Sequence, residues 1–168
     1  MPFWSRKKSP DPADAAQQLR TQALTRTAGE LGVASSAAHP RVFGILMETG
    51  FPEGVATLVV FAEGSTSLYY SNGGGVIGAG DHDSVRETHG PFFAEAEARL
   101  SAFQPAKDMG LPAEGRVRFY LRTFSGTVSA DADEEDLGNM RDQLSALFHA
   151  GHAVITAVRE ATSGEGAV

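Results

Sequence analysis

The sequence predicts an α+β fold in which three helices pack on a single antiparallel sheet of about five strands, in the order α-β-β-β-α-β-β-α. Three observations predict this fold. Short apolar runs separated by glycine-containing turns occupy residues 42–70. An alternating strand pattern lies at residues 116–124, and an amphipathic helical pattern lies near the C-terminus. At 168 residues the chain fits one domain, which we expect over residues 11–161, between flexible tails at 1–10 and 162–168.

The first helix is predicted from Pro12 to Leu31. Asp11 is a capping residue, Pro12 suits the first helical position, and Gly32 follows the last turn. The apolar stripe of this helix is modest, so we expect the helix to pack on one side only.

Three strands joined by short turns follow the first helix. Residues 42–48 and 55–62 are almost continuously apolar, which predicts central strands that are covered on both faces. Residues 66–70 predict the third strand of an antiparallel meander, and Val76 with Ile77 predicts a short fourth strand.

The middle of the chain predicts a helix over residues 83–103. Gly90 and Pro91 interrupt its pattern, which predicts either a kink or a new start at Pro91. Residues 116–124 then alternate in polarity, so this strand has two different faces. One face carries Val117, Phe119 and Leu121, and the other carries Arg116, Arg118, Tyr120 and Arg122.

A short strand at 127–130 and an acidic segment at 131–136 lead to the last helix. We expect the acidic segment to be a solvated helix start, because negative charge is stabilised near a helix N-terminus. The last helix has the clearest amphipathic pattern in the chain. Its apolar face comprises Leu144, Leu147, Phe148, Gly151, Val154, Ile155 and Val158.

Composition excludes several classes of function. The chain has no cysteine, which rules out disulfides, thiolate metal sites and cysteine nucleophiles. Its formal net charge of -7 argues against nucleic-acid binding, because phosphate contacts need a basic surface. The N-terminal residues lack the apolar core of a signal peptide, and no run of about 18 apolar residues occurs. We therefore expect a soluble cytoplasmic protein with no membrane partner.

Five glycines between Ser71 and Asp83 form the strongest functional hint in the sequence. Glycine occurs where φ is positive or where another group approaches the backbone, so the cluster is either a structural corner or a ligand site. It matches neither standard phosphate-binding fingerprint, and Asp81 and Asp83 place carboxylates where a phosphate would lie. As a ligand site it would comprise Asn72, Gly73, Gly74, Gly75, Gly78 and Gly80, with Arg86 as the charged contact.

The polar face of the strand at 116–124 is basic, although the chain as a whole is acidic. Three arginines alternate around one tyrosine, an arrangement that suits an anion, a nucleic-acid strand or an acidic protein partner. These residues are Arg116, Arg118, Tyr120 and Arg122. The arginines can instead pair with carboxylates of the same chain. Candidates for such internal pairing are Glu95, Glu97 and Asp133.

Metal and catalytic sites have weaker support. His149 and His152 lie three residues apart on the last helix, but His152 falls at the edge of the apolar stripe and His149 points almost opposite to it. A third ligand such as His82 would come from distant sequence. The acidic segment has Asp136 where a calcium loop requires glycine. No signature of nucleophilic catalysis occurs, so we predict no catalytic residue, no resident metal and no cofactor.

Three segments resemble a group of short uncharacterised bacterial proteins. They are Phe43-Gly-Ile-Leu-Met-Glu-Thr-Gly-Phe-Pro-Glu-Gly, Ser71-Asn-Gly-Gly-Gly-Val-Ile-Gly and Phe148-His-Ala-Gly-His. The resemblance spans residues 40–160 and implies no particular activity. At the level of the fold, a sheet with flanking helices is similar to profilin- and roadblock-like modules, which serve as interaction and regulatory platforms.

These observations favour a non-enzymatic cytoplasmic module that binds a protein partner and can also form a homodimer. The two very apolar strands and the basic strand face support this interpretation. An alternative is a small-ligand or nucleotide-sensing domain built on residues 72–83. A weaker alternative is a metal-dependent enzyme that uses His82, His149 and His152.

Overall fold

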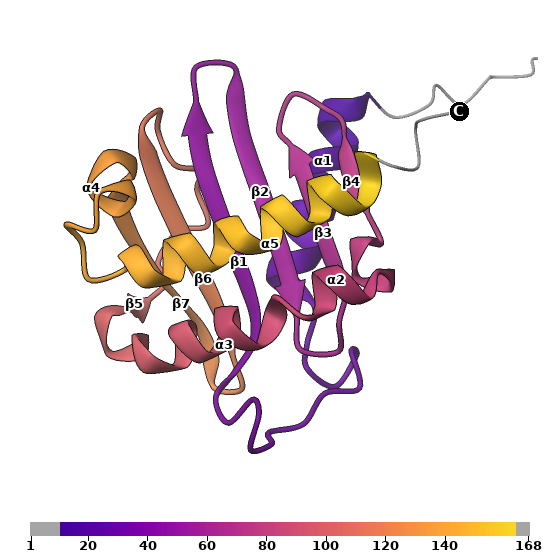
Figure 1. Ribbon diagram of the computed structural model, residues 1–168, viewed down its shortest axis with the longest axis vertical. Coiled ribbons are helices and arrows are strands. Elements are labelled where there is room, and N and C mark those ends of the chain that lie inside the picture. The colour runs from indigo at the N-terminus through magenta and orange to yellow at the C-terminus, as the bar shows by residue number, and fades with distance from the viewer. Residues whose placement is uncertain (1–10, 164–168) are drawn as a thin grey trace, which may run out of the picture.

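One antiparallel sheet of seven strands forms the centre of residues 11–163, which the computed structural model describes (Figure 1). The strands are β1 (Val42–Phe51), β2 (Gly54–Phe61), β3 (Thr66–Tyr70), β4 (Gly75–Ile77), β5 (Gln104–Pro105), β6 (Arg116–Thr123) and β7 (Gly126–Asp133). Their order across the sheet is β4-β3-β2-β1-β6-β7-β5. Of the two predicted tails, residues 1–10 and 164–168 lie outside the described part of the chain.

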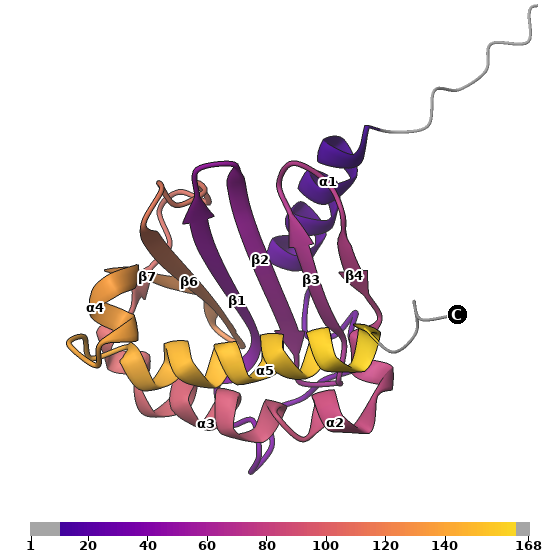
Figure 2. The same cartoon turned by 45° about the horizontal axis from the view of Figure 1, so that its top comes forward.

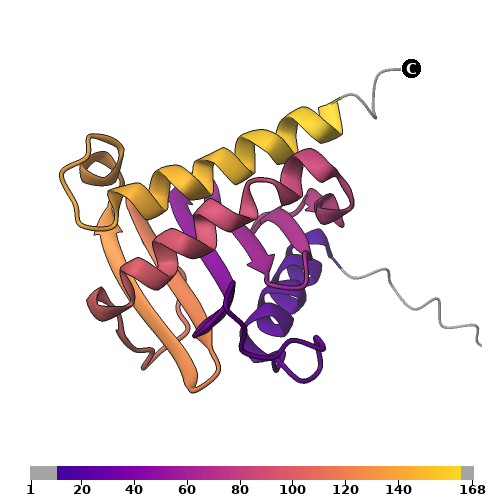
Figure 3. The ribbon, with the colours of Figure 1, turned by 60° about the horizontal axis from the view of Figure 1, so that its bottom comes forward.

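Helices lie on both faces of this sheet. They are α1 (Pro12–Thr25), α2 (Asp83–Arg86), α3 (His89–Ala98), α4 (Glu134–Gly138) and α5 (Ser145–Ser163), and 3-10 turns occupy Ala79–Asp81 and Leu100–Ala102. Figure 2 shows α2, α3 and α5 in front of the sheet and α1 behind it. Figure 3 shows the same arrangement from below, with α1 on the side opposite α3 and α5. No helix within residues 11–163 is both long enough and apolar enough to cross a membrane.

The main core lies between the sheet and the α3–α5 layer. Alternate residues of β1, such as Ile45 and Met47, face this layer and are buried against Phe92 of α3. Gly151 allows α5 to come close to β1, since a Cβ atom there would lie 2.6 Å from the Met47 sulfur. The predicted apolar face of the last helix is therefore confirmed as the face that packs on the sheet.

A smaller core lies between the sheet and α1. The helix contributes Ala16, Ala23 and Leu24, and the sheet contributes Phe43, Leu46, Val59, Phe61, Tyr69 and Tyr120. At its start, Pro12 contacts Gly73 in the β3–β4 turn. Near its end, the Ala23 carbonyl accepts a hydrogen bond of 2.7 Å from Arg122 of β6. The helix therefore crosses the sheet from one edge toward the other and packs on it through small side chains.

The predicted α+β class and single antiparallel sheet are confirmed, and the two faces of the 116–124 strand point as expected. Residues 11–163 contain five α-helices rather than three, because the predicted 83–103 helix is split into α2 and α3 and the short α4 precedes the last helix. The sheet has seven strands rather than about five, because the short β4 and β5 lie at its two edges. The acidic segment divides between two elements. Residues 131–133 belong to β7, and residues 134–136 begin α4, where the Asp133 carboxylate accepts the Asp136 N–H at 3.1 Å.

Three predicted helix boundaries are wrong. The first helix ends at Thr25, because the Thr27 hydroxyl accepts the Glu30 N–H and starts a separate turn. The predicted 83–103 helix is split between Arg86 and His89, so the new start comes two residues before Pro91. Proline fits there because the N–H groups of a first helical turn have no partner in the helix. At the C-terminus α5 continues through residues 162–163 of the predicted tail.

Candidate functional site

A row of polar side chains crosses the α1 face of the sheet, with one residue from each of five neighbouring strands. The strand registers place Glu48 of β1 opposite Thr57 of β2 and opposite Arg118 of β6. Thr57 also lies opposite Tyr69 of β3, and Arg118 lies opposite Asp131 of β7. Residues that pair directly point to the same face of a sheet, so these five side chains form a continuous polar row.

Glu48 is the centre of the polar row and is fully buried. Arg20 of α1 donates from Nε and Nη2 to the two carboxylate oxygens of Glu48, each at 2.8 Å. The Thr57 hydroxyl donates a further hydrogen bond of 2.7 Å to this carboxylate. A buried carboxylate is costly unless it is paired and hydrogen-bonded, so this contact joins α1 to the middle of the sheet through charge as well as packing.

Arg118 and Asp131 form the second charged pair of the polar row. Arg118 donates from Nε and Nη2 to the two Asp131 oxygens, at 2.7 and 2.9 Å. This bidentate contact lowers the pKa of Asp131 and raises the pKa of Arg118. Both groups are therefore ionised at neutral pH.

The loop at 106–115 is held over the polar row by one carbonyl oxygen. The Gly110 oxygen accepts hydrogen bonds from Arg118 Nη1 at 2.7 Å and from Arg20 Nη2 at 3.2 Å. The Tyr120 hydroxyl donates to the same oxygen at 2.7 Å. Three donors from α1 and β6 thus converge on a loop whose residues 107–111 are all exposed.

Tyr69 ends the polar row beneath α1, and its hydroxyl is unsatisfied. The residue is only 4% exposed, yet the hydroxyl has no hydrogen-bond partner within residues 11–163. Burial, and after it the negative charge of Glu48, raises the pKa of the Tyr69 phenol, so the hydroxyl keeps its proton. A buried donor without an acceptor is uncommon in folded proteins, so the Tyr69 hydroxyl is an exception that needs an explanation.

Hollows lie on both sides of α1, and Tyr69 lines each of them. The larger, about 420 Å³, lies between the second half of α1 and the edge formed by β3 and β4, and we call it the α1 groove. The smaller, about 310 Å³, lies beside the first half of α1 and is bounded by β2, β3 and Leu111. We call this second hollow the Tyr69 cleft.

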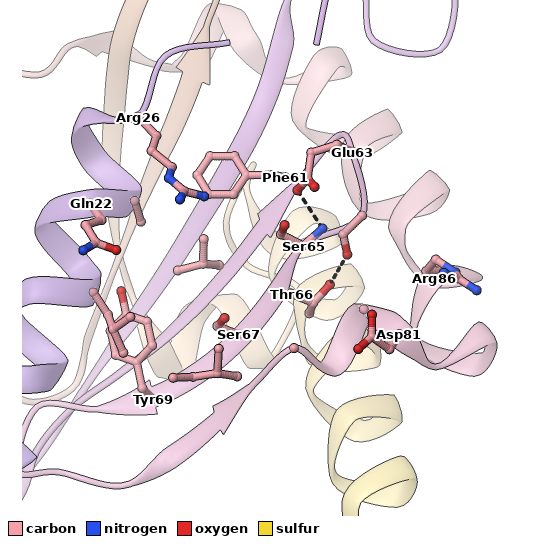
Figure 4. A pocket seen from close by; sticks show the side chains of 17 residues that line it. Gln22, Arg26, Phe61, Glu63, Ser65, Thr66, Ser67, Tyr69, Asp81 and Arg86 are labelled. Carbon is pink, nitrogen blue, oxygen red and sulfur yellow. Dashed lines mark hydrogen bonds between the residues drawn. The ribbon is translucent and has the colours of Figure 1, made fainter. Parts of the chain in front are cut away.

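The α1 groove has an apolar floor and charged walls (Figure 4). Its floor comprises Val59, Phe61, Ser67, Tyr69 and Ile77. Arg26 extends from α1 beside the Phe61 ring, while Glu63 and Asp81 lie across the groove on the β2–β3 turn and the following 3-10 turn. Ile77 of the edge strand is 66% exposed, so the apolar floor reaches the rim of the molecule.

The glycine-rich segment is divided between a turn and the α1 groove. Residues 71–74 connect β3 and β4. Gly73, Gly74 and Gly75, the last of which begins β4, have φ values of 105°, 89° and 139°, which explains these three glycines as a structural corner. Gly78, Gly80 and Arg86 line the groove, whereas residues 72–75 do not. The side chain of Arg86 points away from the α1 wall and pairs with Asp83.

The predicted basic strand face lies mostly beneath α1 and the 106–115 loop. Tyr120 is fully buried, and Arg122 is 8% exposed, with its pKa lowered by burial. Arg118 is paired with Asp131, so Arg116 is the one member of the predicted set that is exposed.

The other interpretation of these arginines was pairing with carboxylates of the same chain, and Arg118 does pair in this way. Its partner is Asp131, which is not one of the three carboxylates that the sequence suggested. Glu95 pairs with Arg99 on the same helix, and Glu97 pairs with Arg41. Asp133 faces Arg116 across the strands and caps α4.

The candidate metal ligands do not form a cluster. Among the described residues, no group of three or more histidine, aspartate or glutamate side chains could hold a metal ion. His149 is exposed, and His152 packs its ring 4.4 Å from the centre of the Phe148 ring. His82 lies just before α2, away from this pair in the sequence.

Sequence reasoning missed Arg20, Glu48, Thr57 and Tyr69. A signal for two of them existed, because the two-residue turn after Phe51 fixes the β1–β2 register and places Glu48 opposite Thr57. The remaining neighbours come from strands and a helix whose pairing no local pattern indicates.

Comparison of the chain with protein-family models, with characterised proteins and with solved structures gives no match. The resemblance to a group of bacterial proteins and the similarity to profilin- and roadblock-like modules thus stay predictions.

Proposed function

We propose that this protein is a non-enzymatic binding module that holds a segment of a partner protein in the α1 groove. The observation that carries the proposal is the open groove of about 420 Å³ whose apolar floor continues to the exposed Ile77 at the sheet edge. Exposed apolar surface that is rimmed by polar residues is typical of interaction sites.

The charges of the groove favour a polypeptide over a small anion. Arg26 lies on one wall, and Glu63 and Asp81 lie on the other, so the walls present both signs of charge. A phosphate-bearing ligand would meet two carboxylates there, whereas a peptide can match charges of both signs along its length.

A small ligand in the same groove is the second candidate. It is favoured by Gly78 and Gly80, which line the groove and belong to the glycine-rich segment. A co-purifying small mass in native mass spectrometry, lost on heating the protein, would support this candidate.

A photo-crosslinking amino acid at position 77 tests the proposed partner site. We expect adducts with a partner protein from Ile77 and none from position 140, because Met140 is equally exposed at 64% but lies on the connection between α4 and α5. An adduct of twice the chain mass in the purified protein would identify the partner as a second copy.

The variant Arg26→Glu provides a matched electrostatic control. Reversing this charge gives the α1 wall the same sign as Glu63 and Asp81 across the groove, where Arg86 is already paired with Asp83, and we expect the Ile77 adduct to fall several-fold. Equal adducts from positions 77 and 140, or no adduct from position 77 in cells, would contradict the proposal.

A further inference from the structure

The β4 edge of the sheet presents backbone groups that no other strand uses. β4 is the outermost strand on its side of the sheet (Figure 2) and pairs with β3 alone. The Tyr70 N–H donates to the Gly74 carbonyl at 3.1 Å, which fixes where the hydrogen-bonded pairs of this ladder fall. Such pairs alternate along an antiparallel ladder. Val76 therefore bonds to β3, whereas the N–H and C=O groups of Gly75 and Ile77 point away from it.

The two edges of the sheet differ in their protection against a further strand. Natural sheets usually protect an exposed edge with charged residues or proline. Pro105 of β5 protects one edge, because proline has no N–H to offer. β4 is short, but it contains neither a proline nor a charged residue. Gly75 and Ile77 are both exposed, and within residues 11–163 neither makes a backbone hydrogen bond outside the sheet, so the β4 edge is open to a further strand.

The floor of the α1 groove reaches this open edge. Ile77 lies opposite Ser67, which is two residues before Tyr69 on β3, and all three side chains line the groove. Side chains of residues that pair across neighbouring strands lie on the same face of a sheet. A strand added beside β4 would therefore extend the floor of the groove, and an apolar side chain on it would cover Ile77, which is now 66% exposed.

An unpaired negative charge lies where β4 ends. A Cβ atom at Gly78, the residue after β4, would lie 3.9 Å from the Asp81 Oδ2 atom. Asp81 is exposed and forms no ion pair with another described residue, because Arg86, the nearest cation in the sequence, pairs with Asp83. A cationic side chain on an added strand would meet this carboxylate just beyond the end of β4. Charge therefore favours a strand with a lysine or an arginine at that point.

We propose that the partner segment binds as an extended strand that pairs with β4 through the outward backbone groups of Gly75 and Ile77. Alternate apolar side chains of this strand lie on the floor of the α1 groove, and a lysine or an arginine lies beside Asp81. Backbone hydrogen bonds then supply affinity, and the side chains supply specificity. The inference rests on the proposed function of the groove, and it adds the conformation and the chemistry of the segment that the groove holds.

The peptide Ac-Lys-Val-Thr-Val-Lys-NH2 tests this proposal, because its valines share one face of a strand and its terminal lysines serve either strand direction. It is titrated to about 5 mM into the 168-residue chain and followed through backbone amide signals in NMR, since short peptides bind weakly. We expect saturable shifts at residues 75–78 and, at saturation, several-fold slower hydrogen exchange of the Gly75 and Ile77 amides. The exchange of the Val76 amide, which already bonds to β3, should change least.

The same peptide with methyl groups on the backbone nitrogens of its Val, Thr and Val residues is the matched control. It keeps every side chain and both charges but lacks the N–H groups with which a strand pairs, so we expect it to give no saturable shift. The variant Asp81→Asn should weaken binding of the unmodified peptide roughly threefold, as the loss of one exposed charge pair does. Glu114→Gln removes an exposed charge from the 106–115 loop and should leave the affinity unchanged.

Three results would overturn the proposal: no saturable shift with the unmodified peptide, equal binding of the methylated peptide, or an unchanged affinity in Asp81→Asn. Crosslinking of a partner from position 77 without peptide pairing would keep the groove as a partner site and exclude the added strand. Peptide pairing without a crosslinked partner would support the β4 edge as a strand-binding surface and contradict the proposed function, so the two proposals can fail separately.

Discussion

Glu48 holds a carboxylate in the middle of a sheet strand, at a point that solvent does not reach. Its cost is offset by Arg20 and Thr57, which satisfy both of its oxygens. The arrangement adds a buried ion pair to the small apolar core that holds α1 on the sheet.

Removing one partner of this pair should be more harmful than removing both. We expect Arg20→Ala to lower the free energy of unfolding by about 3–5 kcal/mol, because it leaves the buried charge of Glu48 unpaired. The double variant Arg20→Met with Glu48→Leu should regain most of that loss. Chemical denaturation measures both values.

Arg26→Ala is the control for this experiment, since Arg26 is an exposed arginine at the residue that follows the last turn of the same helix. Its effect should stay within about 0.5 kcal/mol. If Arg20→Ala lowers the free energy of unfolding by less than about 1 kcal/mol, the Arg20–Glu48 pair does not hold α1 on the sheet.

At the scale of elements, α3 is fixed to the sheet at both of its ends. At its start, His89 Nε2 lies 2.8 Å from the Thr66 hydroxyl of β3. Near its end, the Glu97 carboxylate accepts the N–H groups of Arg41 and Val42, at 2.8 and 2.7 Å. Burial acts to raise the pKa of Glu97, but these hydrogen bonds and Arg41 outweigh it, so the pKa is lowered.

His89 should make the domain sensitive to mild acid. Its pKa is lowered by burial and, less strongly, by Arg86, so the unfolded chain takes up a proton at a higher pH than the folded chain does. The contribution of neutral His89 to the free energy of unfolding is fully present above the unfolded-state pKa of about 6.5, and it decreases as the pH falls below that value. We expect denaturation at pH 5.5 to show a lower unfolding free energy than at pH 7.5.

The variant His89→Gln should show a smaller difference between these two pH values. His152, whose pKa burial also lowers, accounts for a remaining difference of the same sign. His149→Gln is the control, because His149 is exposed. An undiminished difference in His89→Gln would show that the titrating group lies elsewhere.

At the scale of the whole molecule, the two layers on the sheet differ in how firmly they are attached. α5 buries eight of its residues against the sheet and α3, whereas α1 buries three. Segments with few buried apolar contacts open at a lower free energy than the global one.

Hydrogen exchange should reveal this difference directly. We expect the amides of α1 to exchange faster than those of α5, and the central strands β1, β2 and β6 to exchange most slowly. Mass spectrometry of peptic fragments resolves the three regions. Protection of α1 equal to that of α5 would contradict the unequal attachment.

Much of this architecture could be predicted because it depends on local patterns. The apolar runs of β1 and β2 and the stripe of α5 each require only neighbouring residues to identify them. The polar row could not be predicted in the same way, since Tyr69, Glu48 and Asp131 meet through pairing of distant strands. The residues of the predicted basic strand face do share one face of β6. No periodicity in the sequence indicates that α1 and the 106–115 loop cover that face.

The connection between α1 and β1 runs from Arg26 to Arg41 and contains no strand or α-helix. When α1 alone detaches, this connection keeps it near the sheet, so α1 rebinds at an effective concentration set by the length of the connection and not by the amount of protein in solution. Any molecule that binds the sheet surface beneath α1 would therefore compete with α1 itself. Residues inserted into the exposed part of the connection at 34–38 would therefore ease access to that surface, while Ala28, Leu31 and Val33 keep their packing on the core beneath α1.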